Sequence, residues 1–103
     1  MPPTLEVALA PHSESNVWEG LSGIEGVFVA THTRVALGTV VRLVIQLPGG
    51  FEVRTESTAD WRRDDDVGQG SAGIGFRFST PLKKRDRAML KAFSDYRCPV
   101  FFT

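Results

Sequence analysis

Apolar and polar residues alternate along most of the chain before Pro81, which is the pattern of half-buried β-strands. The clearest run is residues 40–47, where the odd positions from 41 to 47 are all apolar while Arg42 and Gln46 occupy the other face. A side-chain period of two places one face of such a strand on a core. Shorter apolar runs at residues 5–9 and 27–31 predict two further strands.

A Pro-Gly-Gly turn at residues 48–50 joins the run 40–47 to a second alternating run at residues 51–56, which predicts a β-hairpin. Residues 57–63 and 73–78 predict the next two strands. The aromatic and aliphatic side chains of the later strands supply most of the expected core. Those expected to face it are Phe28, Ala59, Trp61, Ile74, Phe76 and Phe78.

Two segments carry turn residues. Glycines at positions 20, 23 and 26 interrupt a short strand at residues 17–20 and predict a bulge or tight turn, because glycine adopts backbone conformations closed to other residues. Residues 63–71 hold three consecutive aspartates and two glycines, which indicates an exposed loop.

The hydrophobic period changes after Pro81. Apolar residues at positions 82, 89, 90, 93 and 96 follow a helical stripe, with Thr80 as a candidate N-cap, Pro81 in the first turn and Pro99 beyond the end. The last apolar residues, 100–102, should pack back on the domain. The exposed side of this helix is basic and carries Lys83, Lys84, Arg85, Arg87, Lys91 and Arg97.

Six short strands followed by one helix predict a mainly β fold, a small six-stranded antiparallel β-barrel with a C-terminal α-helix. A chain of 103 residues is expected to form a single domain spanning residues 1–103.

The twelve basic and twelve acidic residues balance, so no overall electric field draws the protein toward nucleic acid or anionic lipid. The start of the chain lacks a signal-peptide pattern and no apolar run can span a bilayer, which favours a cytoplasmic protein without membrane insertion.

No residue pattern supports catalysis, so a non-enzymatic protein is expected. His12 and His32 belong to no Cys/His cluster with metal-ligand spacing, and the acidic run at residues 64–66 lacks the spaced oxygen donors of a calcium loop. Neither a metal nor a cofactor is therefore expected. Cys98 is the only cysteine, which excludes an intrachain disulfide.

The chain combines a glycine-punctuated turn into a hydrophobic strand, a central hairpin, a closing strand and the helix after it. These features lie at residues 21–29, 37–43, 47–50, 59–62, 73–78, 86–90 and 97–102. In their order and spacing they resemble the PilZ domain family, small β-barrels associated with cyclic di-GMP signalling. The resemblance covers most of the chain from Val17 onward and implies the barrel fold.

Family members that bind cyclic di-GMP carry an RxxxR pair before the first strand and a [D/N]xSxxG turn, whose arginines and polar groups hold the ligand. Here no arginine precedes Arg34. Ser22 and Gly26 are kept, but they stand four positions apart rather than three, and Gly20 or Leu21 replaces the Asp/Asn. Ser22 and Gly26 remain ligand-site candidates in a degenerate motif, and cyclic di-GMP binding is not expected.

The resemblance therefore implies a regulatory or adaptor domain that acts through protein–protein interaction in bacterial motility, type IV pilus function or cyclic di-GMP-related signalling. Its protein partner is not identified by any residue. Trp18, a large aromatic in a glycine-rich segment, is one candidate contact if that segment is exposed, since aromatics anchor many interfaces; a buried strand position is the alternative for it. The basic helix is the other, because a charged rim steers an acidic partner. Its candidate residues are Lys83, Lys84, Arg87 and Lys91.

Two alternatives remain open at this point. One is a genuine cyclic di-GMP receptor that draws its arginines from unusual positions or from a second chain, with Arg34, Arg62, Arg63 and the basic helix as the candidates in this sequence. The other is a small nucleic-acid-binding barrel. The chain lacks the interleaved aromatic and basic residues on one strand face that a stacking platform needs, so no nucleic-acid partner is expected.

Overall fold

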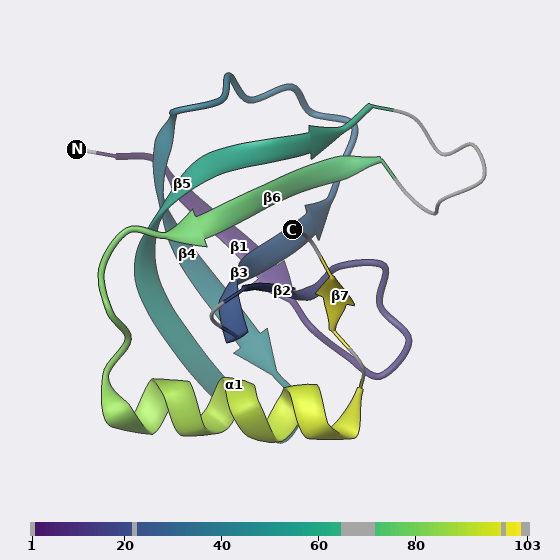
Figure 1. Cartoon of the computed structure of the whole chain (residues 1–103), viewed down its shortest axis with the longest axis vertical. Coiled ribbons are helices and arrows are strands. Elements are labelled where there is room, and N and C mark those ends of the chain that lie inside the picture. The colour runs from purple at the N-terminus through teal and green to yellow at the C-terminus, as the bar shows by residue number, and fades with distance from the viewer. Residues whose placement is uncertain (1, 22, 65–71, 98, 102–103) are drawn as a thin grey trace.

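Seven strands and one helix make up the described part of the fold (Figure 1). The structure is a computed structural model that describes residues 2–21, 23–64, 72–97 and 99–101. The elements in chain order are β1 (Thr4–Ala8), β2 (Asn16–Gly20), β3 (Gly23–Ala30), β4 (Val40–Leu47), β5 (Phe51–Arg63), β6 (Gly73–Phe78), α1 (Lys84–Tyr96) and β7 (Val100–Phe101).

The strands form one mixed sheet in the order β1-β4-β5-β6-β3-β2-β7. The inner pairs are antiparallel, whereas the outer strands β1 and β7 lie parallel to β4 and β2. The prediction of a purely antiparallel, closed barrel is therefore wrong, since no ladder among the described residues joins β1 to β7. A parallel pair needs a long crossover, and residues 9–39 provide one between β1 and β4. The mainly β class and the C-terminal helix are confirmed.

The alternation along β4 is confirmed by its burial. Val41, Leu43, Ile45 and Leu47 are all buried in the core, and Arg42 and Gln46 are exposed. The turn to β5 is made by Gly49 and Gly50, whose φ angles of 87° and 82° lie in the region that favours glycine. The two strands predicted over residues 51–63 are one continuous strand, β5, because no turn residue interrupts the run.

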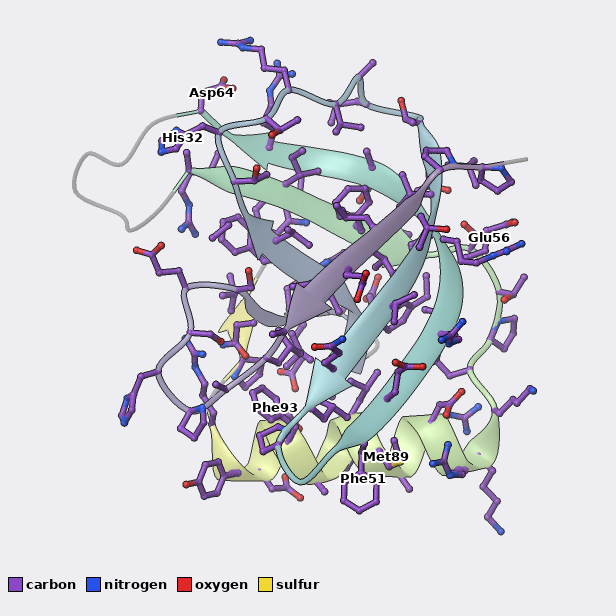
Figure 2. The ribbon with its side chains drawn as sticks, turned by 180° about the vertical axis from the view of Figure 1, so that it is seen from behind. His32, Phe51, Glu56, Asp64, Met89 and Phe93 are labelled. Atoms are coloured by element: carbon purple, nitrogen blue, oxygen red, sulfur yellow. The ribbon has the colours of Figure 1, made fainter. Side chains whose placement is uncertain are left out.

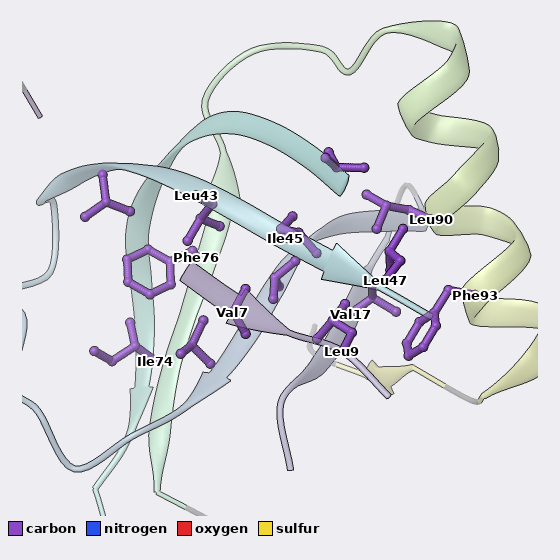
Figure 3. Close-up of a cluster of buried hydrophobic side chains, with 14 of the residues drawn as sticks. Val7, Leu9, Val17, Leu43, Ile45, Leu47, Ile74, Phe76, Leu90 and Phe93 are labelled. Carbon is purple, nitrogen blue, oxygen red and sulfur yellow. The ribbon is translucent and has the colours of Figure 1, made fainter. Parts of the chain in front are cut away.

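The helix lies across one end of the curved sheet (Figure 1). Leu90 and Phe93 point from it into the cluster of buried side chains that strands β1 to β6 supply (Figure 3). The helix begins later than predicted, at Lys84, because Lys83 has an extended backbone with φ −61° and ψ 152°; Thr80 is not its N-cap. After the helix, β7 pairs with β2, so the expectation that the chain end packs back is confirmed for the backbone of Val100 and Phe101. Phe102, the last residue of that prediction, lies outside the described residues.

Phe28 and Trp61 lie on the opposite side of the sheet from the core, which corrects their predicted orientation. Val27 and Val29 both face the core, so the period of two turns Phe28 away from it. Ala59 faces the core as predicted, but the register of β5 shifts between Ala59 and Trp61. This bulge reverses the side on which Trp61 lies. Phe76 is fully buried in the core and Phe78 packs partly against it, as predicted.

The outer aromatic side chains pack onto glycines of the sheet. Phe28 and Trp61 both pair with Gly75, one from each neighbouring strand, and their rings stack with centroids 5.4 Å apart. A Cβ on Gly75 would overlap the Trp61 ring. Trp18 contacts Trp61 edge-on, with ring centroids 5.8 Å apart, so that Phe28, Trp61 and Trp18 form a row of aromatic rings. Because Gly75 of β6 has no side chain, Phe28 of β3 and Trp61 of β5 can touch across the strand that separates them.

Replacing Gly75 with Ala should lower the free energy of unfolding by about 1–3 kcal/mol, because the added methyl displaces the Trp61 ring. Urea denaturation followed by tryptophan fluorescence measures this loss. In a double-mutant cycle, Gly75→Ala should cost at least about 1 kcal/mol less when Trp61 is already Ala, since the space is then vacant. Strictly additive costs would show that the two residues do not collide.

Candidate functional site

A groove of about 910 Å³ runs between the β2–β3 turn and the segment that leads from β6 into α1. We call it the turn–helix groove. Its apolar lining includes Ile24, Phe78, Leu82 and Leu90. The β2–β3 side adds the carboxylates Glu19 and Glu25, and the helix side adds the cations Arg87 and Lys91. The volume lies within the range of small-molecule and peptide sites.

The β2–β3 turn contains the predicted irregularity. Gly23 has a φ of 97°, which favours glycine, and the register between β2 and β3 shifts after Trp18. Trp18 pairs with Gly26 and Glu19 pairs with Ile24, so Glu25 is the unmatched residue of a β-bulge. The bulge directs the Glu25 side chain toward Arg77 of β6.

Arg77 is held on three sides. Its guanidinium forms ion pairs with Glu25 and, at 3.0 Å, with Asp60, and it lies 4.9 Å from the centroid of the Trp18 ring. Burial lowers the pKa of Arg77, but hydrogen bonds to Glu25 and Asp60 outweigh this and raise the pKa above its ordinary value. The positive charge nearest the turn is therefore engaged by two carboxylates.

The helix side of the groove is basic and exposed. Arg87 donates a hydrogen bond of 3.2 Å to the carbonyl oxygen of Leu82, which fixes the entry to the helix. Lys91 donates to Asp95 at 2.7 Å, and this hydrogen bond raises the pKa of the ammonium. Of the four predicted helix residues, these two line the groove; Lys83 and Lys84 are exposed beside it at the start of the helix.

Trp18 is not an exposed contact, and that expectation is wrong. Its side chain is 0% exposed, and its Nε1 donates a 3.0 Å hydrogen bond to the carbonyl oxygen of Phe76. The ring fits there because Gly26 has no side chain: a Cβ at Gly26 would overlap both that oxygen and the indole nitrogen. Gly26 is thus buried under Trp18 and does not line the groove. Ser22 lies outside the described residues.

The arginines of the alternative receptor hypothesis gather elsewhere. Arg34, Arg62 and Arg63 line one polar hollow of about 190 Å³ at the end of the sheet formed by the end of β5 and the start of β6. Asp64, the first residue of the predicted acidic loop, lines it too, and the rest of that loop lies outside the described residues. The sequence alone did not indicate that these three arginines meet.

Sequence reasoning also missed Glu25, Asp60 and Arg77. The available signal was the four-residue interval between Ser22 and Gly26, which is one longer than in the motif it resembles. That interval suggested a bulge but did not indicate which residue the bulge leaves unmatched.

The described residues hold no group of three His, Cys, Asp or Glu side chains placed to bind a metal ion. Within that same part of the chain, no helix is long and apolar enough to cross a membrane. No protein-family model and no curated protein matches the sequence.

Replacing Arg77 with Ala should lower the free energy of unfolding by about 1–3 kcal/mol, because two partly exposed ion pairs and one cation–π contact are lost. The loss should shrink in 1 M salt, where the Debye length is about 3 Å. Arg54→Ala is the matched control, since its ion pair with Glu52 is more exposed and should contribute less to stability. Equal losses for the two variants in urea denaturation would contradict a special role for Arg77.

Proposed function

We propose that this chain is a PilZ-like regulatory or adaptor domain that binds another protein, performs no catalysis and does not use cyclic di-GMP as its ligand. The observation that supports this most is the charge at the turn–helix groove. Its β2–β3 side presents the carboxylates Glu19 and Glu25, and Arg77 is already paired with Glu25 and with Asp60 of β5. The turn corresponds to the ligand turn of the family that the sequence resembles.

A doubly anionic dinucleotide meets two costs at such a turn. Like charges about 4 Å apart repel by about 1–4 kcal/mol as the effective dielectric constant falls from about 80 to about 20, so Glu19 opposes a phosphate. The ion pair of Glu25 with Arg77 leaves that arginine unable to offset the repulsion. The RxxxR pair of ligand-binding members is also missing, and two lost charge-assisted hydrogen bonds forfeit about 3–6 kcal/mol. Together these terms remove most of the free energy of a micromolar complex, about 8 kcal/mol.

A protein segment suits the groove better. Ile24, Leu82 and Leu90 offer an apolar lining for one inserted side chain, which is where binding energy concentrates in interfaces. Arg87, which donates a hydrogen bond to the carbonyl oxygen of Leu82 rather than to a carboxylate, then favours an acidic residue next to that side chain. The exposed Lys83 and Lys84 extend the positive field and would steer such a partner. By the same resemblance, we place the interaction in the bacterial cytoplasm, in motility, type IV pilus function or cyclic di-GMP-related signalling.

Calorimetric titration of the full chain with cyclic di-GMP should give no saturable binding tighter than about 100 µM, equivalent to about 5.5 kcal/mol. The reason is the carboxylate-lined turn and the missing arginine pair. A dissociation constant in the low micromolar range would overturn the proposal and favour the receptor alternative. Repeating the titration with Glu25→Gln would then show whether the turn is where the dinucleotide binds.

The protein contact can be located by photo-crosslinking in the native cell. A photo-reactive residue at Thr80, which is exposed and lines the groove, should crosslink a protein segment that carries an acidic residue beside an apolar one. Reversing charge with Lys84→Glu and Arg87→Glu should lower the yield about tenfold, since each exposed pair contributes up to about 1 kcal/mol.

Two controls make this experiment decisive. The same probe at Thr33, exposed at the other end of the sheet, should not capture that segment. The matched double reversal Arg42→Glu and Arg54→Glu, on exposed positions of β4 and β5, should leave the yield unchanged. Equal capture from Thr33, or an equal loss with the control reversal, would show that the groove is not the contact.

A further inference from the structure

A second polar hollow lies away from the turn–helix groove, where the end of β3, the end of β5 and the start of β6 meet. Figure 2 shows His32 and Asp64 at this end of the molecule, opposite the helix that carries Met89 and Phe93. The hollow has a volume of about 190 Å³. We call it the arginine hollow. Its charged and polar lining consists of Thr31, His32, Thr33, Arg34, Arg62, Arg63 and Asp64.

We propose that the arginine hollow is a binding site for a phosphate dianion, either free phosphate or the phosphomonoester group of a small ligand. The lining residues that the structure describes include three guanidinium groups and one carboxylate. Like charges gathered around one hollow repel one another, and a bound anion would reduce that repulsion. Arginine also matches a phosphate geometrically, because its planar fork donates two parallel hydrogen bonds.

Two of the arginines are held in place by contacts within the protein, and the contact of Arg62 leaves donors for a ligand. Arg62 uses its Nε to contact Asp64 at 2.8 Å, so the two terminal nitrogens keep their four N–H donors outside that contact. Arg63 lies 4.7 Å from the centroid of the Phe28 ring, which fixes its guanidinium by stacking. Such positioning lowers the ordering cost of binding.

The loop after β3 is also fixed, and it brings Arg34 to the hollow. The backbone N–H of Thr31 donates to the carbonyl oxygen of Ala72 at 3.1 Å, which ties the end of β3 to the start of β6. The hydroxyl oxygen of Thr31 accepts a 3.0 Å hydrogen bond from the backbone N–H of Thr33. Its own hydrogen can still be donated to an anion.

The size of the hollow limits the ligand. Sites for drug-sized molecules occupy about 300–1,000 Å³, and the arginine hollow is smaller than that range. A cyclic dinucleotide is therefore too large to be enclosed, whereas a single tetrahedral anion fits the dimension and the charge. The proposal is independent of the protein-binding groove, which lies at the other end of the sheet.

The test is calorimetric titration of the full chain with inorganic phosphate at constant ionic strength. We expect one saturable site with a dissociation constant of about 1 mM or tighter. Arg34→Gln and Arg62→Gln should each weaken binding about tenfold or more, since each removes a charge-assisted hydrogen bond. Both residues are exposed, so both variants should keep the melting temperature of the unaltered chain.

Arg42→Gln, an equally exposed arginine on β4, is the matched control and should bind phosphate as the unaltered chain does. Adenosine monophosphate is the second probe: tighter binding than inorganic phosphate would assign the site to a phosphomonoester, and equal binding to free phosphate. An absence of saturable binding up to about 20 mM, twenty times the expected dissociation constant, would overturn the proposal. Equal weakening by Arg42→Gln would overturn it too, because the attraction would then be a general effect of charge.

Discussion

The row of aromatic rings on the outer face of the sheet is the packing interaction on which both candidate sites depend. Phe28, Trp61 and Trp18 come from three strands and touch in sequence across the sheet. Each end of the row carries an arginine, Arg63 over Phe28 and Arg77 over Trp18. The rings therefore fix the positions of two guanidinium groups, one at the arginine hollow and one at the turn–helix groove.

This arrangement requires glycine beneath the rings. Adjacent strands lie about 4.8 Å apart, so side chains two strands apart normally cannot meet across an intervening side chain. Gly75 separates Phe28 from Trp61, and Gly26 separates Trp18 from Arg77 in the strand pairing. The glycines weaken their strands locally, since they contribute no side-chain packing of their own. The aromatic layer compensates by burying Trp18 and Phe28 almost completely.

The two ends of the row differ in charge. Arg77 forms ion pairs with Glu25 and Asp60, so its positive charge is compensated within the protein. Arg63 instead shares its hollow with Arg34 and Arg62, against the single carboxylate of Asp64 among the described lining residues. The same row of rings thus carries a cation paired with two carboxylates beside an apolar groove, and a cation that lies with two further arginines beside a small polar hollow. This difference is why we assign a protein partner to one end and an anion to the other.

Much of the fold was predictable because it depends on local periodicity. The alternation of β4, the hairpin to β5 and the helical stripe that includes Leu90 and Phe93 are all encoded in neighbouring residues. The parallel pairings of β1 and β7 were not predictable, because they join segments far apart in the chain.

The candidate sites were less predictable because bulges and distant contacts determine them. Trp61 was assigned to the core because a period of two was carried across the bulge after Ala59. Trp18 was expected at the surface because glycines usually mark exposed turns, whereas here Gly26 makes room for its ring. The convergence of Arg34 with Arg62 depends on how the loop after β3 meets the end of β5, which no local pattern encodes.

One residue connects the degenerate motif with the proposed function. Ser22 and Gly26 stand four positions apart, one more than in the ligand turn of the family that the sequence resembles. The β2–β3 pairing leaves Glu25 unmatched in the same interval, and Glu25 is also the residue that binds Arg77. On the proposed interpretation, a single additional residue would both break the ligand turn and supply the carboxylate that occupies the nearest arginine. Shortening the turn alone would then leave Arg77 paired with Asp60, so regaining a dinucleotide site would require new cations as well as the shorter turn.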